Sequence, residues 1–213
     1  MSRLRSLCLV AVCLVFAACG TVTDDGSLFD QLVSRVQESQ DEARFGALRT
    51  ADAPVLQIAI QKREQSGSLL LERRDGPFEY WLSSDGVQII LEDGMVHGVR
   101  GLGDGLLASE LSEPLARLRG LQEGPSDRFH SYLDGNDMVV TRTYRCAFRE
   151  VRNIPIDVEG GQFDTVLFRE SCNSLDQSFE NLYWVDTITR QIVQSRQWIG
   201  PFTEALSTRI VLR

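Results

Sequence analysis

Short apolar segments separated by Asp-Gly and Ser-Gly turns constrain the fold of this chain more than any other feature. From Val55 onward, apolar and polar residues alternate with a period of two, and turn residues recur at intervals of roughly ten residues. In the first half the pattern predicts strands over 55–61, 68–72, 78–82, 87–91 and 95–97. In the second half it predicts strands over 137–149, 163–172, 179–186, 191–199 and 203–212. Because so many strands cannot lie flat, we expect a mainly β fold, an antiparallel meander curled into an incomplete or half-open barrel.

Two stretches break this alternation and are predicted to be helical. Apolar residues recur at helical spacing from Leu28 to Val36, which predicts an amphipathic helix that begins at Ser27 and ends near Arg44. Its polar face is not enriched in Lys or Arg, so packing against the domain is favoured over a lid or a membrane-surface helix. A short internal helix is predicted to begin with Ser112 as its N-cap and to end before Gly124.

The N-terminus has the features of a bacterial lipoprotein signal. A basic opening precedes an apolar run over 7–18, which is too short to span a bilayer as a permanent helix. The segment 14–20 then ends in Ala-Ala-Cys-Gly, a lipobox in which the thiol of Cys19 accepts diacylglycerol. We therefore predict a signal peptide over 1–18, a tether over 19–27 and a single β domain with an N-terminal helix over 28–213. The alternative is an ordinary signal peptide cut after Gly20.

Charge and anchoring limit the partners of the mature chain. Removing residues 1–18 takes away Arg3 and Arg5, so the formal charge of −8 becomes −10. Such an acidic domain is predicted to bind no nucleic acid, because phosphates demand basic surface. Two or more acyl chains at Cys19 would hold the domain firmly on a membrane. Gly20 is not the Asp that retains lipoproteins in the inner membrane, so we predict the periplasmic face of the outer membrane.

Two cysteines remain in the mature domain, Cys146 and Cys172. A hairpin that turns at Val158–Gly161 would bring them to nearly opposite positions, and the periplasm oxidises thiols, so we predict a disulfide. The alternatives are two reduced, buried thiols or a metal site. The two histidines, His97 and His130, show no ligand spacing, which argues against a metal.

No stretch carries a recognisable catalytic or cofactor motif. The glycine-rich segment 98–105 lacks the Lys-Ser/Thr pair and the long helix of a phosphate loop, and is predicted to be a turn-rich connection. Residues 134–137 lack the later bidentate Glu of a calcium loop and are predicted to form a hairpin turn. No carboxylate pair stands out as a general acid and base. We therefore predict no catalytic residues, cofactor or metal, and a protein that is not an enzyme.

The most distinctive internal stretch is residues 183–201, which we interpret as a hairpin whose turn is capped by Asp186. This signature hairpin resembles the C-terminal signature of the YjbF/GfcB family of outer-membrane lipoproteins. The matching residues are Trp184, Asp186, Thr189, Ser195 and Gln197. Segments 81–85 and 94–102 resemble earlier parts of the family pattern. Arg190 departs from it, since the family usually has Gly there; a positive φ at that site would cost Arg about 1 kcal/mol.

The resemblance implies an accessory of exopolysaccharide or group 4 capsule secretion across the outer membrane. Its expected partners are an outer-membrane β-barrel exporter and a periplasmic protein, and polysaccharide is a candidate ligand. Trp81, Trp184 and Trp198 could stack on sugars, although burial is the commoner fate of Trp. The alternative function is a carrier or acceptor of lipid or lipoprotein in a half-barrel, like the outer-membrane lipoprotein receptor LolB, which needs an apolar concavity of ligand size. A hydrolase that trims the polymer ranks last, because it requires a carboxylate pair.

Overall fold

The computed structural model describes residues 25–103, 105–134, 136 and 138–212, with side chains from Ser34 onward. The predicted signal peptide and Cys19 lie outside the described residues. The chain divides into two compact units, Met1–Gln40 and Asp41–Arg213, and the second contains the whole sheet. Within the described part of the chain, no helix combines the length and the apolar character needed to cross a bilayer.

Helix α2 (Asp25–Thr50) begins inside the predicted tether and extends six residues beyond the predicted end at Arg44. Its last turns belong to the same unit as the sheet, where Phe45 and Leu48 pack against a small cluster of Ala53, Val55 and Leu70. Val36, part of the apolar pattern that predicted the helix, is 55% exposed. Phe45 and Leu48 lie beyond the predicted helix end, so the packing of the predicted apolar face over 28–36 stays a prediction.

Twelve strands form one antiparallel sheet. In chain order they are β1 (Val55–Ile60), β2 (Gln65–Asp75), β3 (Phe78–Leu82), β4 (Gln88–Glu92), β5 (Met95–Arg100), β6 (Leu106–Glu110), β7 (Gly124–Leu133), β8 (Val139–Val158), β9 (Gly161–Asn173), β10 (Ser178–Asp186), β11 (Ile192–Gly200) and β12 (Glu204–Ile210). A 3-10 turn, η2 (Gln61–Arg63), follows β1. Ten of these strands correspond to predicted segments, with boundaries that differ by a few residues at most ends.

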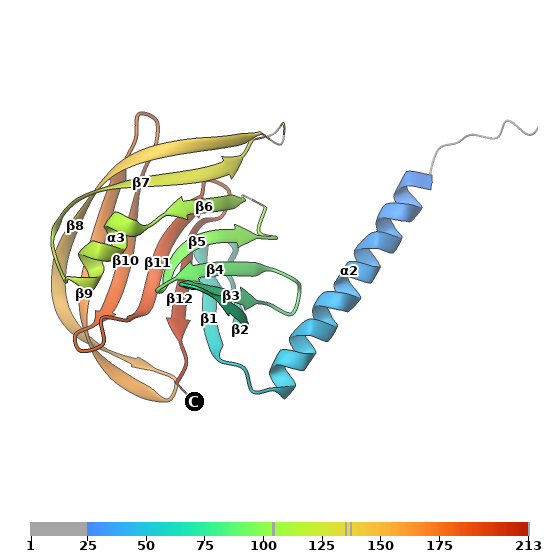
Figure 1. The fold of residues 1–213 in the computed structure, drawn as a ribbon, viewed down its shortest axis with the longest axis horizontal. Coiled ribbons are helices and arrows are strands. Elements are labelled where there is room, and N and C mark those ends of the chain that lie inside the picture. Colours follow the sequence, from blue (N-terminus) through green and yellow to red (C-terminus); the bar gives the residue numbers. More distant parts are fainter. Residues whose placement is uncertain (1–24, 104, 135, 137, 213) are drawn as a thin grey trace, which may run out of the picture. The chain divides into compact units, whose positions relative to one another are not determined.

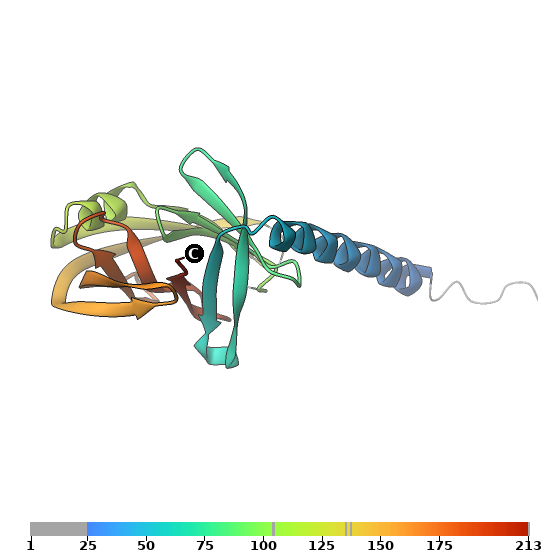
Figure 2. The same ribbon diagram turned by 90° about the horizontal axis from the view of Figure 1, so that it is seen from below.

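The sheet curls into a nearly closed barrel with one seam (Figures 1 and 2). Its hydrogen-bonded order runs from β5 through β1 and β12 to β6, so the two edge strands are consecutive in the chain. They approach closely at Gly98, where a Cβ atom would lie 2.8 Å from the Leu107 carbonyl oxygen. The absence of a side chain at Gly98 therefore lets the two edges meet. This architecture confirms the predicted incomplete barrel.

The hairpin β8–β9 turns where the sequence predicted it, at Glu159–Gly160. Gly160 has φ +91°, and a Cβ atom there would overlap the Leu212 carbonyl group. Both the left-handed backbone and the close approach of the C-terminal segment therefore require glycine. Residues 134–138 also form the predicted hairpin turn, because Asp134 Oδ1 accepts hydrogen bonds from the backbone N–H groups of Asn136 and Met138.

Strands β6 and β7 were not predicted, and the predicted N-cap of the internal helix was wrong. Helix α3 (Ser112–Arg119) ends before Gly124, as predicted, and Gly124 begins strand β7. Ser112 is the first helical residue and not the N-cap; its hydroxyl group donates a hydrogen bond to the Glu110 carboxylate. In β7 the inward positions carry Ser126, Arg128 and His130, all buried, so the apolar alternation that identifies a strand is missing.

Two large apolar clusters line the barrel interior. One joins strands β1–β6 with β11 and β12 and includes Leu56, Leu69, Trp81, Ile89, Val96 and Leu206. The other places Leu115 and Leu118 of α3 against Phe148, Phe168, Tyr183 and Val185 of β8, β9 and β10. In Figure 1, α3 lies across this part of the sheet. A helix therefore covers the inner face on one side of the barrel, whereas strands pack on one another on the other side.

Candidate functional site

The signature hairpin is built from β10, β11 and a turn stabilised by Asp186. Its Oδ2 atom accepts hydrogen bonds from the Thr189 backbone N–H at 2.7 Å and from the Thr189 hydroxyl at 2.6 Å. Although burial alone would raise the pKa of Asp186, these hydrogen bonds hold that pKa below its ordinary value. Arg190 has φ +64°, so the position where the family usually has Gly does adopt the left-handed conformation.

Ser195 and Gln197 lie on the inner face of β11, where they connect three parts of the barrel. The Ser195 hydroxyl is 2.7 Å from the Thr208 hydroxyl of β12 and accepts a hydrogen bond from Gln197 Nε2 at 2.8 Å. Gln197 also accepts from the Val96 backbone N–H at 2.9 Å and donates to the Gly94 carbonyl oxygen at 3.0 Å. Ser195 and Gln197 therefore have structural roles, because they join β11 to β12 and to the β4–β5 hairpin.

The three tryptophans have different environments. Trp81 is buried in the apolar cluster of β1–β6. Trp198 stacks on Phe179 with a ring-centroid distance of 5.6 Å. Trp184 is half-buried and points away from the core, because its neighbours Tyr183 and Val185 belong to the interior cluster. Of the three indole rings, that of Trp184 is therefore the one placed to meet a ligand on the outer surface.

A buried ionic cluster lies inside the barrel between β7, β9 and β10. Arg128 donates from Nε and Nη2 to the two carboxylate oxygens of Glu170 at 3.1 and 3.0 Å, and both side chains are at most 2% exposed. Tyr183 and Asn181 donate to the same carboxylate at 3.0 and 2.7 Å. Although burial opposes its charge, the attraction of Glu170 raises the pKa of the Arg128 guanidinium. Burial raises the pKa of Tyr183, which stays a neutral donor.

Sequence reasoning missed this cluster. Arg128 and Glu170 are 42 residues apart, and a charged residue in an alternating segment is typical of a solvent-facing position. The histidine next to it, His130, is fully buried among Tyr132, Tyr144 and Phe179. Burial and the nearby Arg128 charge lower the pKa of His130 well below its ordinary value, so the imidazole is neutral.

Cys146 and Cys172 form a disulfide, as the hairpin geometry predicted. The two residues are direct partners in the β8–β9 register, with a Cα–Cα distance of 4.0 Å. Together with Glu170 they form the one close group of three candidate metal ligands among the described residues. Both sulfur atoms are used by the disulfide and the carboxylate binds Arg128, so this group does not fit a metal ion.

A cavity of about 750 Å³ lies between α3 and the strands β1, β3, β11 and β12. Apolar side chains of both interior clusters line it, among them Leu56 and Leu118. Five charged side chains also line it, and four of these form the ion pairs Arg74–Glu79 and Arg119–Asp93. The cavity is therefore of ligand size, and apolar groups outnumber charged ones in its lining.

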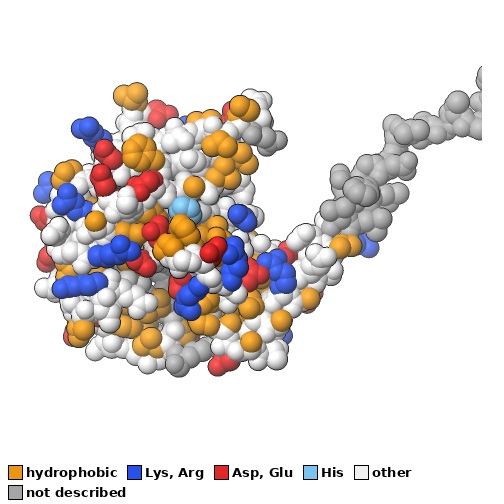
Figure 3. Space-filling view, in the orientation of Figure 1, with side chains coloured by type: hydrophobic (Ala, Val, Ile, Leu, Met, Phe, Trp, Pro, Cys, Tyr) orange, Lys and Arg blue, Asp and Glu red, His pale blue; other side chains and the backbone are white. Residues whose placement is uncertain are grey.

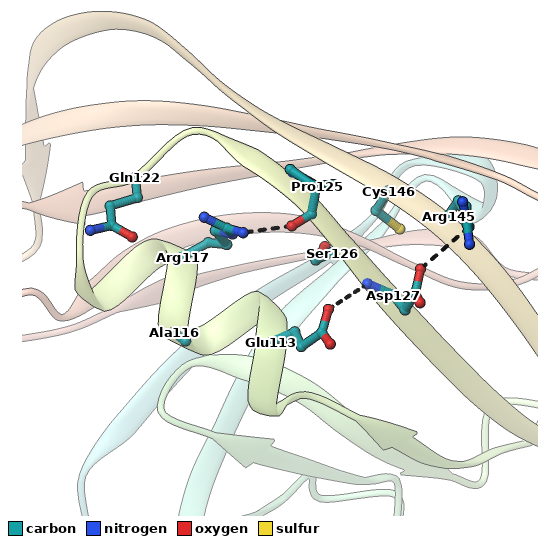
Figure 4. Close-up of a pocket in the computed structure, with 9 residues that line it drawn as sticks. All are labelled: Glu113, Ala116, Arg117, Gln122, Pro125, Ser126, Asp127, Arg145 and Cys146. Atoms are coloured by element: carbon teal, nitrogen blue, oxygen red, sulfur yellow. Dashed lines mark hydrogen bonds and ion pairs between the residues drawn. The ribbon is translucent and has the colours of Figure 1, made fainter.

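A second concavity of about 470 Å³ lies between α3 and the strands β7 and β8 (Figure 4). Two of its charged side chains are bonded within the site: Glu113 accepts from the Asp127 backbone N–H at 2.8 Å, and Arg117 donates to the Pro125 carbonyl oxygen at 3.1 Å. Asp127 also lies 3.8 Å from Arg145. These contacts fix α3 on the sheet, which is a structural use of the charged residues that line the pocket.

The surface shown in Figure 3 carries acidic and basic side chains in alternation. Apolar side chains gather at the end of the β7–β8 hairpin, where Leu133, Met138, Val139 and Val140 are 41–64% exposed. Nothing in the described part of the chain covers this hairpin end.

Comparison with known proteins shows a family and a similar solved structure. Residues 28–211 match the family described as "Group 4 capsule polysaccharide lipoprotein gfcB, YjbF". The crystal structure of the hypothetical lipoprotein YmcC from Escherichia coli (K12) is similar, with a TM-score of 0.67 and 19% sequence identity over 75% of this chain and 86% of that one. No curated protein sequence matches significantly. At this level of identity the YmcC structure shows a shared fold.

Proposed function

Because this chain belongs to the group 4 capsule polysaccharide lipoprotein family (YjbF/GfcB), we propose that it is an accessory of capsule or exopolysaccharide secretion across the outer membrane. The family match carries this proposal, since it covers almost all of the mature chain. The protein binds the polymer or scaffolds an outer-membrane exporter together with a periplasmic partner. It has no catalytic role in this proposal.

Lipid anchoring is part of the same proposal. The lipobox that ends at Cys19 supports acylation of that residue, and Gly20 supports transport to the outer membrane. The acidic domain would then work on the periplasmic face, close to an exporter in the same membrane. Tethering raises the effective concentration of the domain at the exporter, so weak contacts would be sufficient.

A carrier of lipid or lipoprotein in a half-barrel is the second candidate function. A carrier of acyl chains needs an apolar cavity of ligand size. The cavity of about 750 Å³ has that size, and apolar side chains such as Leu56 and Leu118 line much of it, beside the ion pairs Arg74–Glu79 and Arg119–Asp93. The family match favours the secretion accessory over this carrier.

A deletion strain tests both the role and the anchor. We expect the strain to retain polymer in the periplasm and to recover surface polymer when the wild-type gene is supplied. A form in which residues 1–19 are replaced by a general signal peptide should reach the periplasm without lipid and restore little secretion. Surface and periplasmic polymer are quantified separately, and labelled palmitate reports acylation of the wild-type chain.

Normal surface polymer in the deletion strain would contradict the secretion role. Full rescue by the unlipidated form would contradict the need for an anchor while leaving the secretion role in place. Immunoblots of fractionated cells must show equal amounts of both forms, so that a loss of secretion reports position and not abundance.

A further inference from the structure

The outer surface of strands β10, β11, β12, β1 and β2 forms a groove of about 680 Å³. Its side chains alternate with those of the core, because Leu56, Leu206 and Tyr183 on the same strands point inward. Figure 2 shows the β1–β2 hairpin at a steep angle to the β8–β9 hairpin, so the sheet bends between them. We call this surface the outer groove.

The strand register aligns the outer groove in two rows. Direct cross-strand partners place Trp184, Gln194, Arg209, Gln57 and Ser68 in the first row. The second row, by the same pairings, contains Leu182, Arg196, Ser207, Ala59 and Ser66. Neighbouring strands lie about 4.8 Å apart, so each row extends roughly 19 Å across the sheet. That length accommodates several linked sugar rings.

Amide, hydroxyl and guanidinium groups dominate both rows, with one indole ring at the end. Two arginines, Arg196 and Arg209, are held by neutral groups: Arg196 Nε donates to Gln61 Oε1 at 3.2 Å and Arg209 Nε to Gln194 Oε1 at 2.7 Å. Neither takes part in an ion pair among the described residues. One carboxylate contacts the groove, that of Glu159, which accepts from Gln57 at 3.1 Å.

We propose that the outer groove binds a glycan strand that carries carboxylate groups. This inference rests on the proposed function and selects polymer binding over pure scaffolding. The Trp184 ring packs on the apolar C–H face of a sugar, while Gln57, Gln194 and the serines bind hydroxyl groups. Arg196 and Arg209 keep their planar donors positioned by glutamines and bind the carboxylates of the polymer.

The other two concavities lack this combination. The pocket of Figure 4 has its charged groups bonded to one another and to the backbone, and the cavity beside α3 is lined mostly by apolar side chains and by two ion pairs. Even in an acidic protein, a surface with two arginines that form no ion pair attracts anionic ligands locally. The outer groove is therefore the surface that fits an anionic polymer.

Binding is measured with the purified full-length lipoprotein in detergent, using oligogalacturonate as the anionic probe and a malto-oligosaccharide as the neutral one. Calorimetry gives affinity, and tryptophan emission reports contact with Trp184. We expect oligogalacturonate to bind, to perturb the emission and to bind less tightly as salt rises. The double variant R196Q/R209Q should bind it at least about tenfold more weakly, the equivalent of about 1.4 kcal/mol.

W184A should weaken binding by a similar factor and remove the emission change. The matched controls are R149Q/R152Q, which removes two exposed arginines of β8 outside the groove, and F129A, which removes an exposed aromatic ring of β7. Both controls should bind like wild type. Thermal unfolding measures whether each variant is folded. We expect all of them to fold, because the substituted side chains are exposed or half-buried.

Oligogalacturonate binding that is absent in wild type, or equal in wild type and the groove variants, would overturn the inference. A preference for the neutral probe would also overturn it. The combined variant W184A/R196Q/R209Q is then returned to the deletion strain. Full secretion by this variant, with secretion lost in the deletion strain, would overturn the groove and leave the accessory function intact. Normal secretion by the deletion strain would instead contradict the proposed function.

Discussion

The two sides of the barrel interior are built differently. On the side of β1–β5 and β12, inward residues such as Leu56, Leu69 and Ile89 are apolar and almost fully buried. On the side of β7–β10, the interior holds the ion pair of Arg128 and Glu170 within a ring of aromatic side chains. The first side obtains its stability from surface removed from water. The stability of the second side also depends on the network of hydrogen bonds around this ion pair.

The largest expected effect comes from breaking the ion pair from one side. E170M leaves the Arg128 guanidinium buried without a counter-charge and removes the acceptor of Asn181 and Tyr183. We expect a loss of about 3–5 kcal/mol in the free energy of unfolding, measured by urea titration. The control E180M removes an exposed carboxylate that lies 3.9 Å from Arg169 and should cost less than about 1 kcal/mol.

The double variant R128M/E170M sharpens this result. It removes both charges, so it should recover a large part of the stability that E170M loses. If the double variant is as unstable as E170M, the ion pair and hydrogen bonds of the cluster stabilise the fold in their own right. The cost of E170M would then not come only from the unpaired charge of Arg128. The two sides of the interior would then differ less in their dependence on polar contacts than we infer.

This difference also explains how much of the fold the sequence could predict. Strands β1–β5 were found because apolar residues alternate with polar ones and Asp-Gly turns separate them. Strand β7 was missed because its inward residues, among them Arg128 and His130, are polar or charged, and its first two residues are Gly and Pro. A strand that faces a polar interior has the pattern of a solvated loop, and only the partner residue on another strand shows that the charge is paired.

The candidate sites followed the same rule. Local features were predicted: the capped turn at Asp186 and the disulfide of Cys146 and Cys172 each depend on one hairpin. The outer groove was not predicted, because it forms only where Trp184 of β10 and Gln57 of β1 are aligned across three strand pairings. Strand order links segments more than 100 residues apart, and periodicity within one segment carries no information on it.

A cavity on the apolar side provides the matching test. Leu69 of β2 is 0% exposed, and L69A should lower the free energy of unfolding by about 3 kcal/mol through lost burial and the cavity left behind. Leu175 is fully exposed, so L175A serves as the control and should change stability by less than about 0.5 kcal/mol. If L69A costs well below about 1 kcal/mol, this side is loosely packed. Such a result would contradict our inference that the β1–β5 side is stabilised by apolar burial.

Gln197 joins β11 to the β4–β5 hairpin, and its replacement should have an intermediate effect. Q197M leaves the Val96 N–H and the Gly94 carbonyl group without their side-chain partner, at a cost of about 2 kcal/mol in urea unfolding. The control Q194M changes an outward residue of the same strand and should cost less than about 1 kcal/mol. Equal stability of Q197M and wild type would show that β5 is held to β11 by packing alone.

The smallest effect concerns pH and is confined to the polar side. His130 is neutral in the folded protein because burial, and then Arg128, lower its pKa. The unfolded chain takes up this proton below about pH 6.5, so the folded state loses stability as the pH falls from about 6.5 to 5, by at most about 1.4 kcal/mol per pH unit. Urea titrations across this range give the dependence of the unfolding free energy on pH. This dependence should disappear in H130F and remain in H97F, which keeps His130. An unchanged slope in H130F would place the acid sensitivity outside the polar interior and remove His130 from the account of how the two sides differ.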